Sequence, residues 1–339
     1  MVIQMSNSDK RIAWVDLLKG IAILWLIVYH MHIFDWMRSP VPVFFFLSGL
    51  FFSEGKSFSS FIGRKAKALL IPLLFFFILG VAASALKCYL QGETYSFPPL
   101  WLFATMIPID AEVTNPIGVG AIWFLMSLFE IYIIYYLLRR VSGNVWWLII
   151  AGVLLYLVSC ITMQYYAHGA IFYLFYTFGF CIYFIVAHLL REKVLCGEIP
   201  VWLLIISVAA YCLKFLDISN MLNVNSIGGG IMLRIKGLIS ITGLIVVFIW
   251  MCKKLMTFRL VSESKICKFM VFEGRNSLTI LGVHMLVMGV MAILLKKIMP
   301  MGWSYYLILF VIIVVLSNIC ILLFNRYVPF LVNHKTEKN

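Results

Sequence analysis

The sequence predicts an all-α integral membrane protein, a bundle of about ten transmembrane helices with both termini in the cytoplasm. Of the 339 residues, 63% are hydrophobic and only 12% are charged, whereas about a quarter of the residues in a typical soluble domain are charged. Apolar stretches long enough to cross about 30 Å of hydrocarbon recur along the chain. Lys and Arg gather in alternate short loops, as they do in multi-pass proteins.

Nine apolar stretches reach spanning length, and short polar turns separate most of them. In chain order they are 12–34, 69–88, 118–138, 145–163, 170–190, 201–216, 231–252, 276–297 and 303–325. A tenth, shorter stretch at 40–53 is either a short span or a re-entrant segment. No room remains for a second, soluble domain.

The predicted domain organisation is therefore simple. It consists of a cytoplasmic N-terminal tail (1–11), a membrane domain (12–325) and a cytoplasmic C-terminal tail (326–339). The part of the tail after Pro329 is short and polar, and we do not expect it to fold.

The basic residues decide whether the stretch at 40–53 crosses the membrane. If all ten stretches span, nineteen of the 27 Lys and Arg residues fall on one side and seven on the other, with Lys19 inside the membrane. Such an excess marks the cytoplasmic side and favours ten spans. The net charge of +13 then reflects topology, so no nucleic-acid partner is needed to explain it. We expect a multi-pass protein of the inner (cytoplasmic) cell membrane, in contact with its lipids.

The cysteines give no sign of a metal or redox site. The eight of them form no C-x-x-C motif and no Cys/His cluster at metal-ligand spacing. We therefore predict no metal site and interpret the cysteines as small apolar packing residues.

The first apolar stretch carries three ionisable side chains, Asp16, Lys19 and His30. A charge at the centre of a membrane helix costs about 2.5–3.5 kcal/mol on insertion scales, so such residues are usually functional. At about 100° per residue, all three fall on one stripe of the helix. In the simplest alternative, Asp16 pairs with Lys19 and His30 only caps the far end. The functional interpretation is a polar track from a cytoplasmic anionic ligand to a base near the opposite surface.

These residues closely resemble the opening of the acyltransferase-3 family of multi-pass membrane O-acyltransferases. The resemblance is carried by residues 16–22 (DLLKGIA), by the pair Tyr29-His30 and by residues 42–49 (PVFFFLSG). Within the family, the chain looks most similar to stand-alone sugar O-acetylases of the fucose 4-O-acetylase type.

Three further landmarks of the family follow in order. Residues 64–67 (RKAK) resemble a basic R-x-x-R turn on the loop before the third span, residues 121–125 (AIWFL) open the fourth span, and residues 274–278 (GRNSL) lead to His284. One position departs from the pattern. Leu281, three residues before His284, is often aromatic in the family, which puts aromatic stacking there in doubt.

The resemblance covers roughly residues 11–325 and implies an activity. Such proteins move an acyl group, usually acetyl, from cytoplasmic acyl-CoA to a hydroxyl of an extracytoplasmic glycan, so acetyl-CoA and a carbohydrate or lipid-linked glycan are the expected partners. The family's basic-x10-His element maps onto Lys19 and His30, and its basic turn maps onto Arg64 and Lys67.

The residue chemistry agrees with this reaction, which needs a base for the hydroxyl proton and a grip on the phosphates of the donor. His30 is the natural general base because histidine titrates near neutrality; the alternative is that it accepts the acyl group covalently. With Lys19 and Asp16 it forms the predicted catalytic set.

The predicted CoA-binding residues are the cations and helix-capping groups near the cytoplasmic side. They are Arg64, Lys67, Arg275, Asn276 and Ser277. The positive-inside rule alone is the alternative explanation for the cations. We expect neighbouring Lys65 to be a bystander charge.

Four more residues in the spans are candidate site residues. Glu130 is expected to face the bundle interior and pair with Lys19 or a histidine, and His284 lies about 12 Å into its helix. Arg234 is a candidate for gripping an anionic acceptor, and we place Trp123 with it. The structural alternatives are a helix–helix hydrogen bond for His284, snorkelling for Arg234 and an interfacial position for Trp123.

The main alternative function is a transporter or flippase of a glycan or lipid-linked intermediate, in which a polar stripe is equally natural. Such proteins show internal symmetry and paired broken helices, which this sequence lacks. Another class of membrane acyltransferase, with its catalytic His and Asn in later helices, is disfavoured by the position of His30. No G-x-S-x-G or G-D-S element follows the last span, so no fused esterase-type domain is predicted.

Overall fold

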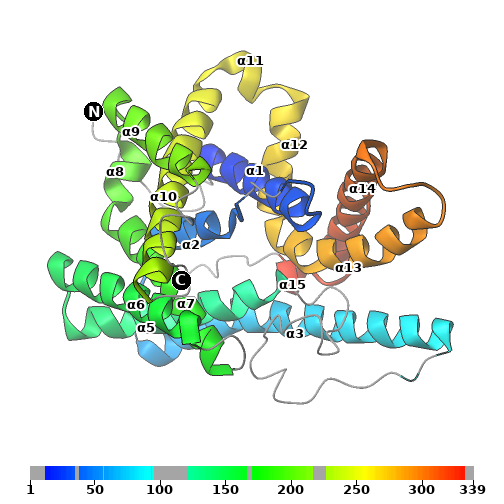
Figure 1. Cartoon of the computed structure of the whole chain (residues 1–339), viewed down its shortest axis with the longest axis horizontal. Helices are drawn as coiled ribbons and strands as arrows, with labels where there is room; N and C mark the ends of the chain where they lie inside the picture. Colours follow the sequence, from blue (N-terminus) through cyan, green and yellow to red (C-terminus); the bar gives the residue numbers. More distant parts are fainter. Residues whose placement is uncertain are drawn as a thin grey trace.

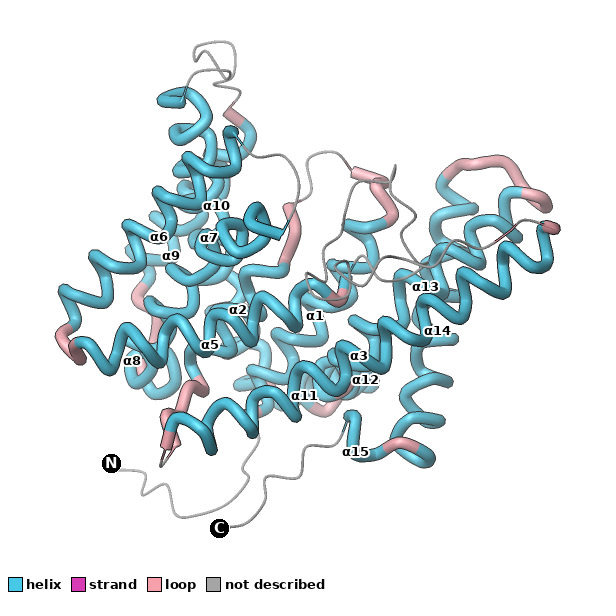
Figure 2. Tube along the Cα trace, turned by 90° about the horizontal axis from the view of Figure 1, so that it is seen from below, coloured by secondary structure: helices cyan, strands magenta, loops and turns pink. Residues whose placement is uncertain are grey.

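The described part of the protein is entirely helical wherever it is regular (Figures 1 and 2). The structure is a computed structural model, and it describes residues 12–34, 38–55, 57–92, 94, 121–165, 170–216 and 227–332. No strand occurs in these ranges. The predicted all-α class is therefore confirmed, while the predicted N-terminal tail (1–11) and the start of the span expected at 118–138 lie outside the described residues.

Ten helices correspond to the ten predicted apolar stretches. They are α1 (Ala13–His30), α2 (Val41–Leu50), α3 (Phe58–Gln91), α5 (Trp123–Val141), α6 (Val145–Tyr165), α7 (Ala170–Leu189), α9 (Val201–Cys212), α10 (Ile227–Thr257), α13 (Ser277–Lys296) and α14 (Trp303–Tyr327). Shorter helices connect or follow them. These are α8 (Arg191–Cys196), η2 (Leu213–Phe215), α11 (Arg259–Ser262), α12 (Lys265–Arg275) and α15 (Pro329–Val332).

Six of the described helices are long and apolar enough to cross a membrane: α1, α3, α6, α10, α13 and α14. Helices α2, α7 and α9 are apolar over shorter lengths, and α5 carries the charged side chains of Glu130, Arg139 and Arg140. The protein is thus a multi-pass membrane protein by its helices. The count of ten spans and the cytoplasmic location of both termini stay predictions.

Helix α3 begins eleven residues before the predicted start of its span at residue 69. Ser57 caps it, because its side-chain oxygen accepts a hydrogen bond from the backbone N–H of Ser60. The basic segment 64–67 consequently lies in the second and third turns of a helix, and the prediction that it forms a loop was wrong. Ser57 is the sequence signal that marks this earlier start.

Helix α12 was not predicted, because its basic residues placed it in a cytoplasmic loop. It packs along α1, and the two backbones touch. A Cβ atom at Gly274 would lie 1.8 Å from the carbonyl oxygen of Asp16, and one at Gly20 would lie 1.8 Å from that of Met270. Only glycine permits so close an approach, which fixes α12 against the start of α1.

Helix α1 lies in the middle of the bundle (Figure 1), where it packs against α2, α10, α12 and α13. Helices α5, α6, α7 and α9 lie on one side of it in this view, and α13 and α14 lie on the other. The core around α1 and α2 is formed by fully buried aliphatic and aromatic side chains, among them Leu18, Ile23, Val43 and Phe45. The helix with the predicted polar stripe is therefore surrounded by protein.

The fold continues past the predicted end of the membrane domain at residue 325. Helix α14 runs to Tyr327 and α15 follows at Pro329–Val332. Leu331 is buried, and α15 packs against α3 and α14. The expectation that nothing folds after Pro329 was wrong for these residues, because Phe330 and Leu331 supply apolar surface directly after the proline.

Candidate active site

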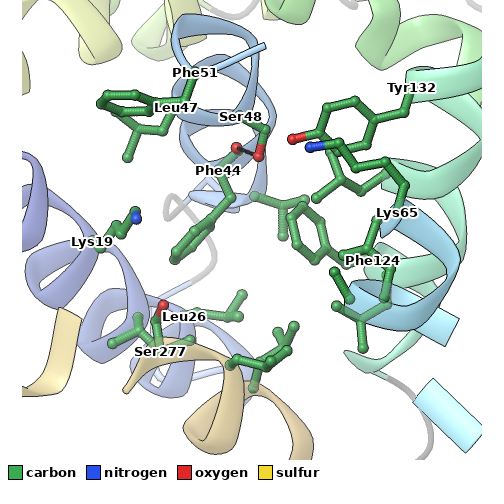
Figure 3. A pocket seen from close by; sticks show the side chains of 18 residues that line it. Lys19, Leu26, Phe44, Leu47, Ser48, Phe51, Lys65, Phe124, Tyr132 and Ser277 are labelled. Atoms are coloured by element: carbon green, nitrogen blue, oxygen red, sulfur yellow. Dashed lines mark hydrogen bonds between the residues drawn. The ribbon is translucent and has the colours of Figure 1, made fainter. Parts of the chain in front are cut away.

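A cavity of about 380 Å³ lies between α1, α2, α3, α5 and α13 (Figure 3). Most of its wall is aliphatic or aromatic. The few polar side chains on the wall are those of Lys19, Ser48, Lys65, Tyr132 and Ser277. A largely apolar cavity with a few convergent polar groups is the usual form of a small-molecule site.

The α1 wall of the cavity lies on the stripe that the sequence predicted. Lys19, Ile23 and Leu26 line the cavity, and their spacing of four and three residues places them on one helix face. His30 continues this face one turn beyond Leu26, about 6 Å further along the axis. The face therefore leads from a cation through apolar side chains to a histidine.

Helix α13 repeats this arrangement. Ser277, Leu278 and Leu281 line the cavity, and His284 follows three residues after Leu281. The two helices run in the same direction, because Lys19 and Ser277 share the cavity while the rings of His30 and His284 meet beyond it, with centroids 5.3 Å apart. Leu281, at the position that is often aromatic in the family that the sequence resembles, adds an aliphatic side chain to the cavity wall.

The contacts of the two histidines indicate which ring nitrogens carry protons. His30 Nδ1 lies 2.6 Å from the sulfur of Met285, and His284 Nδ1 lies 2.8 Å from the carbonyl oxygen of Ile280. Neither a thioether nor a carbonyl can donate, so Nδ1 is the donor in both neutral rings. The Nε2 atoms then carry lone pairs and are able to accept a proton.

The two histidines differ in their surroundings. His284 is fully buried, and its Nε2 has no hydrogen-bond partner among the described residues. His30 is only partly buried. His30 is thus the histidine that a second molecule can reach, and His284 lies behind it.

Lys65, expected to be a bystander, is the cation of the 64–67 segment that lines the cavity. Its ammonium lies 3.7 Å from the centroid of the Tyr132 ring, on the wall opposite Lys19 (Figure 3). Arg64 and Lys67 are exposed on the same helix and do not line the cavity. Helical periodicity explains this, since Lys65 shares a face with Ala68 and Leu69.

Asp16 and Arg275 form an interhelical ion pair near the Lys19 end of the cavity. Arg275 Nε donates to a carboxylate oxygen of Asp16 over 3.1 Å. Asp16 is buried and does not line the cavity. This pair joins the start of α1 to the end of α12, so the structure gives Asp16 a supporting position.

Asn276 and Ser277 were expected to cap the helix that contains His284. Asn276 does occupy the position before α13, but its side chain makes no capping hydrogen bond. Instead its Nδ2 donates to the carbonyl oxygen of Phe272 over 2.8 Å. The expected side-chain cap was wrong, whereas Ser277 lines the cavity.

The expectation that Glu130 pairs with Lys19 or a histidine was wrong for the described residues. The Thr177 hydroxyl donates to a Glu130 carboxylate oxygen over 2.7 Å, and the Thr177 oxygen also lies 2.8 Å from the Ser127 hydroxyl. These contacts tie α5 to α7. Glu130 does not line the cavity.

Arg234 and Trp123 lie near a second, smaller cavity of about 150 Å³ between α6, α7 and α10. Arg234 lines it. Trp123 packs against Tyr176 and Phe180, two residues of its wall, with ring centroids 5.2 and 5.7 Å away. The two residues that the sequence grouped as acceptor-binding are therefore close to one cavity.

The helices and the cavity define a multi-pass membrane protein with a partly polar site inside the bundle. The chain belongs to the acyltransferase-3 family, because the family described as an acyltransferase domain (Acyl_transf_3) matches residues 12–322. It is therefore a membrane acyltransferase. No curated protein and no solved structure matches the chain.

Proposed function

We propose that this protein moves an acetyl group from cytoplasmic acetyl-CoA to a hydroxyl of an extracytoplasmic or lipid-linked glycan, with His30 as the general base. The observation that carries the proposal is the position of His30. It lies one helical turn beyond a cavity that holds two lysines near its other end. This is the order that a donor with anionic phosphates and a distant thioester requires.

The cavity supports the donor part of the proposal. Lys19 and Lys65 approach it from opposite sides (Figure 3) and supply cations for phosphate groups. The exposed cations Arg64, Lys67 and Arg275 add long-range attraction for an anionic donor. The apolar side chains between Lys19 and Leu26 suit an extended thioester arm, because they exclude water from the reacting end.

The tautomer of His30 supports the role of base. Its Nε2 takes the proton of the acceptor hydroxyl, and the oxygen attacks the thioester carbonyl carbon. The tetrahedral intermediate then collapses, the carbon–sulfur bond breaks, and the leaving thiolate recovers the proton from His30. The ester and free CoA thiol are the products. The His284 ring packs beside that of His30, with centroids 5.3 Å apart.

Membership of an acyltransferase family disfavours the transporter or flippase alternative. Within the family, the proposed subtype is a stand-alone sugar O-acetylase of the inner cell membrane. The Lys–x10–His stripe formed by Lys19 and His30 is the sequence feature that favours this subtype.

The test uses a deletion strain complemented with the wild type, with His30→Ala or with His32→Asn. We expect the acetyl content of the envelope glycans, measured by mass spectrometry, to be restored by the wild type and His32→Asn but not by His30→Ala. His32 is an exposed neighbour with a φ of 51°, a conformation that Asn tolerates. It therefore controls for loss of a histidine.

Protein amounts and thermal unfolding in detergent accompany this comparison, so that a folding defect in His30→Ala is recognised. Full acetylation by a folded His30→Ala protein would refute the mechanism. Unchanged acetylation together with an altered amount of surface glycan would favour the transporter.

A further inference from the structure

The cavity between α6, α7 and α10 has an unusual lining for the interior of a membrane bundle. Its wall combines one arginine, Arg234, with aromatic side chains and small polar groups. The aromatic residues are Tyr156, Tyr176, Phe180 and Tyr183, and the small residues include Ser159, Gly179 and Gly237. Aromatic faces next to a cation suit a ligand that has both an apolar face and a negative charge.

The guanidinium of Arg234 has no anionic partner among the described residues. Its contact is Nη1 to the sulfur of Met163 over 3.3 Å, and a thioether is only a weak acceptor. Arg234 is half-buried. A cation within a membrane helix is costly and is normally paired or functional. The side chain therefore presents unused donors to the cavity.

The backbone around Arg234 is held in place independently of any ligand. The Tyr156 hydroxyl donates to the Arg234 carbonyl oxygen over 2.6 Å, which joins α6 to α10. Gly179 lets α6 and α7 pack closely, since a Cβ there would lie 2.9 Å from the Ser159 hydroxyl. The three helices that line the cavity are thus held together by contacts of their own.

The pocket lies near the end of the bundle that holds His30. The rings of Tyr29 and His30 have centroids 5.5 Å apart. Pro42, at the start of α2, lines the pocket, and its neighbour Val41 lines the first cavity together with Leu26, one turn before His30. A molecule that reaches from Arg234 past Pro42 would therefore approach the proposed base.

We propose that this pocket is the acceptor subsite for an acidic sugar, whose phosphate or carboxylate oxygens bind Arg234 and whose ring packs on the aromatic wall. The inference rests on the proposed function and deepens it, because it assigns the acceptor to the class of acidic glycans or sugar phosphates. A planar guanidinium binds either oxyanion through two parallel hydrogen bonds.

Gly237 provides a test that does not touch the arginine. It lines the pocket, and a Cβ at this position meets nothing within 4 Å. Gly237→Leu should therefore fill the pocket, whereas Gly237→Ala should be tolerated. Lys236→Gln is the charge control, because it removes a cation from the adjacent position while Lys236 lies outside this pocket and bonds to the Leu216 carbonyl oxygen.

The experiment measures binding to purified protein in nanodiscs of neutral phosphatidylcholine, by isothermal titration with glucose 1-phosphate, glucuronate, glucose and inorganic phosphate. We expect at least one of the two acidic sugars to bind wild type, Gly237→Ala and Lys236→Gln more tightly than glucose or phosphate. Arg234→Gln should bind it about 30-fold more weakly, and Gly237→Leu should bind it as weakly. Equal affinity in all variants, or no preference for either acidic sugar, would overturn the proposal.

A lipid headgroup is the other source of such an oxyanion. Nanodiscs that contain anionic phosphatidylglycerol separate the two sources: competition between this lipid and the acidic sugar at Arg234 would overturn the assignment to the acceptor. Because these measurements record binding without acetyl transfer, they stand apart from the proposed function. If the protein binds an acidic sugar but transfers no acetyl group, the proposed acetyltransferase function is refuted and the acidic-sugar pocket is not.

Discussion

At the scale of single residues, the sulfur of Met285 fixes the state of the proposed base. Its contact with His30 Nδ1 leaves Nε2 unprotonated, so removing the sulfur should reduce the population of the reactive tautomer. Leucine has nearly the volume of methionine and no acceptor.

We therefore expect Met285→Leu to lower kcat about twofold, the value of one weak hydrogen bond, with little change in thermal unfolding. Initial rates at saturating acetyl-CoA and a melting curve in detergent check this. An unchanged kcat would show that the sulfur does not set the tautomer.

Lys65 gives a second prediction for a single residue. Because it lines the cavity while Lys67 is exposed on the same helix, Lys65→Ala should raise the KM for acetyl-CoA about tenfold, as expected for a lost charge-assisted hydrogen bond. Lys67→Ala should raise it less, since a solvent-exposed cation is screened by salt. Steady-state kinetics measure the KM for acetyl-CoA of both variants. A larger increase for Lys67→Ala would indicate that the donor binds at the exposed face of α3.

At this scale, sequence reasoning identified the stripe of Lys19 and His30 but not the orientation of the residues around it. Helical spacing within one element is calculable from sequence, and it predicted that Lys19 and His30 share a face. The partners of Asp16 and Glu130 belong to other elements, and neither spacing nor composition specifies which helices pack together. Asn276 instead bonds back by one turn to Phe272, because it also ends α12, a helix that the sequence did not predict.

At the scale of helices, the contact between α1 and α12 makes the sharpest prediction. Gly274→Ala should destabilise the protein by about 1–3 kcal/mol, because its Cβ would overlap the backbone of Asp16. Gly63→Ala is the matched control, since a Cβ at Gly63 on α3 meets nothing within 4 Å. Thermal unfolding of the two variants in one detergent measures the difference, and equal melting temperatures would contradict the close contact.

Sequence patterns located the helices better than their ends. The apolar stretches correspond to ten helices, since long hydrophobic runs are the strongest local signal. The start of α3 and the whole of α12 were missed because their residues are partly charged. The charged residues in these segments predicted loops, although a capped or amphipathic helix next to a membrane tolerates charged residues.

At the scale of the whole molecule, two native cysteines can test the predicted topology. Cys196 and Cys212 are exposed and lie at opposite ends of the α9 region. If ten spans are present with cytoplasmic termini, a membrane-impermeant maleimide should label Cys212 in intact cells and Cys196 only after permeabilisation.

Two variants make the assignment unambiguous, one with Cys196 and one with Cys212 as its single remaining cysteine. A variant without any cysteine provides the background. Labelling of both positions from the same side would show that α9 does not cross. Reversed labelling would place the predicted cytoplasmic loops outside.

The parallel course of α1 and α13 sets the length of thioester arm that the proposed donor needs. From Lys19 to His30 the rise of eleven helical residues is about 16 Å, and Ile23 and Leu26 occupy the intervening wall. A thioester anchored by its phosphates near Lys19 reaches His30 only if its arm spans that length. A short donor such as S-acetylcysteamine gains nothing from the anchor, so its kcat/KM should be insensitive to Lys65→Ala even though that of acetyl-CoA is not.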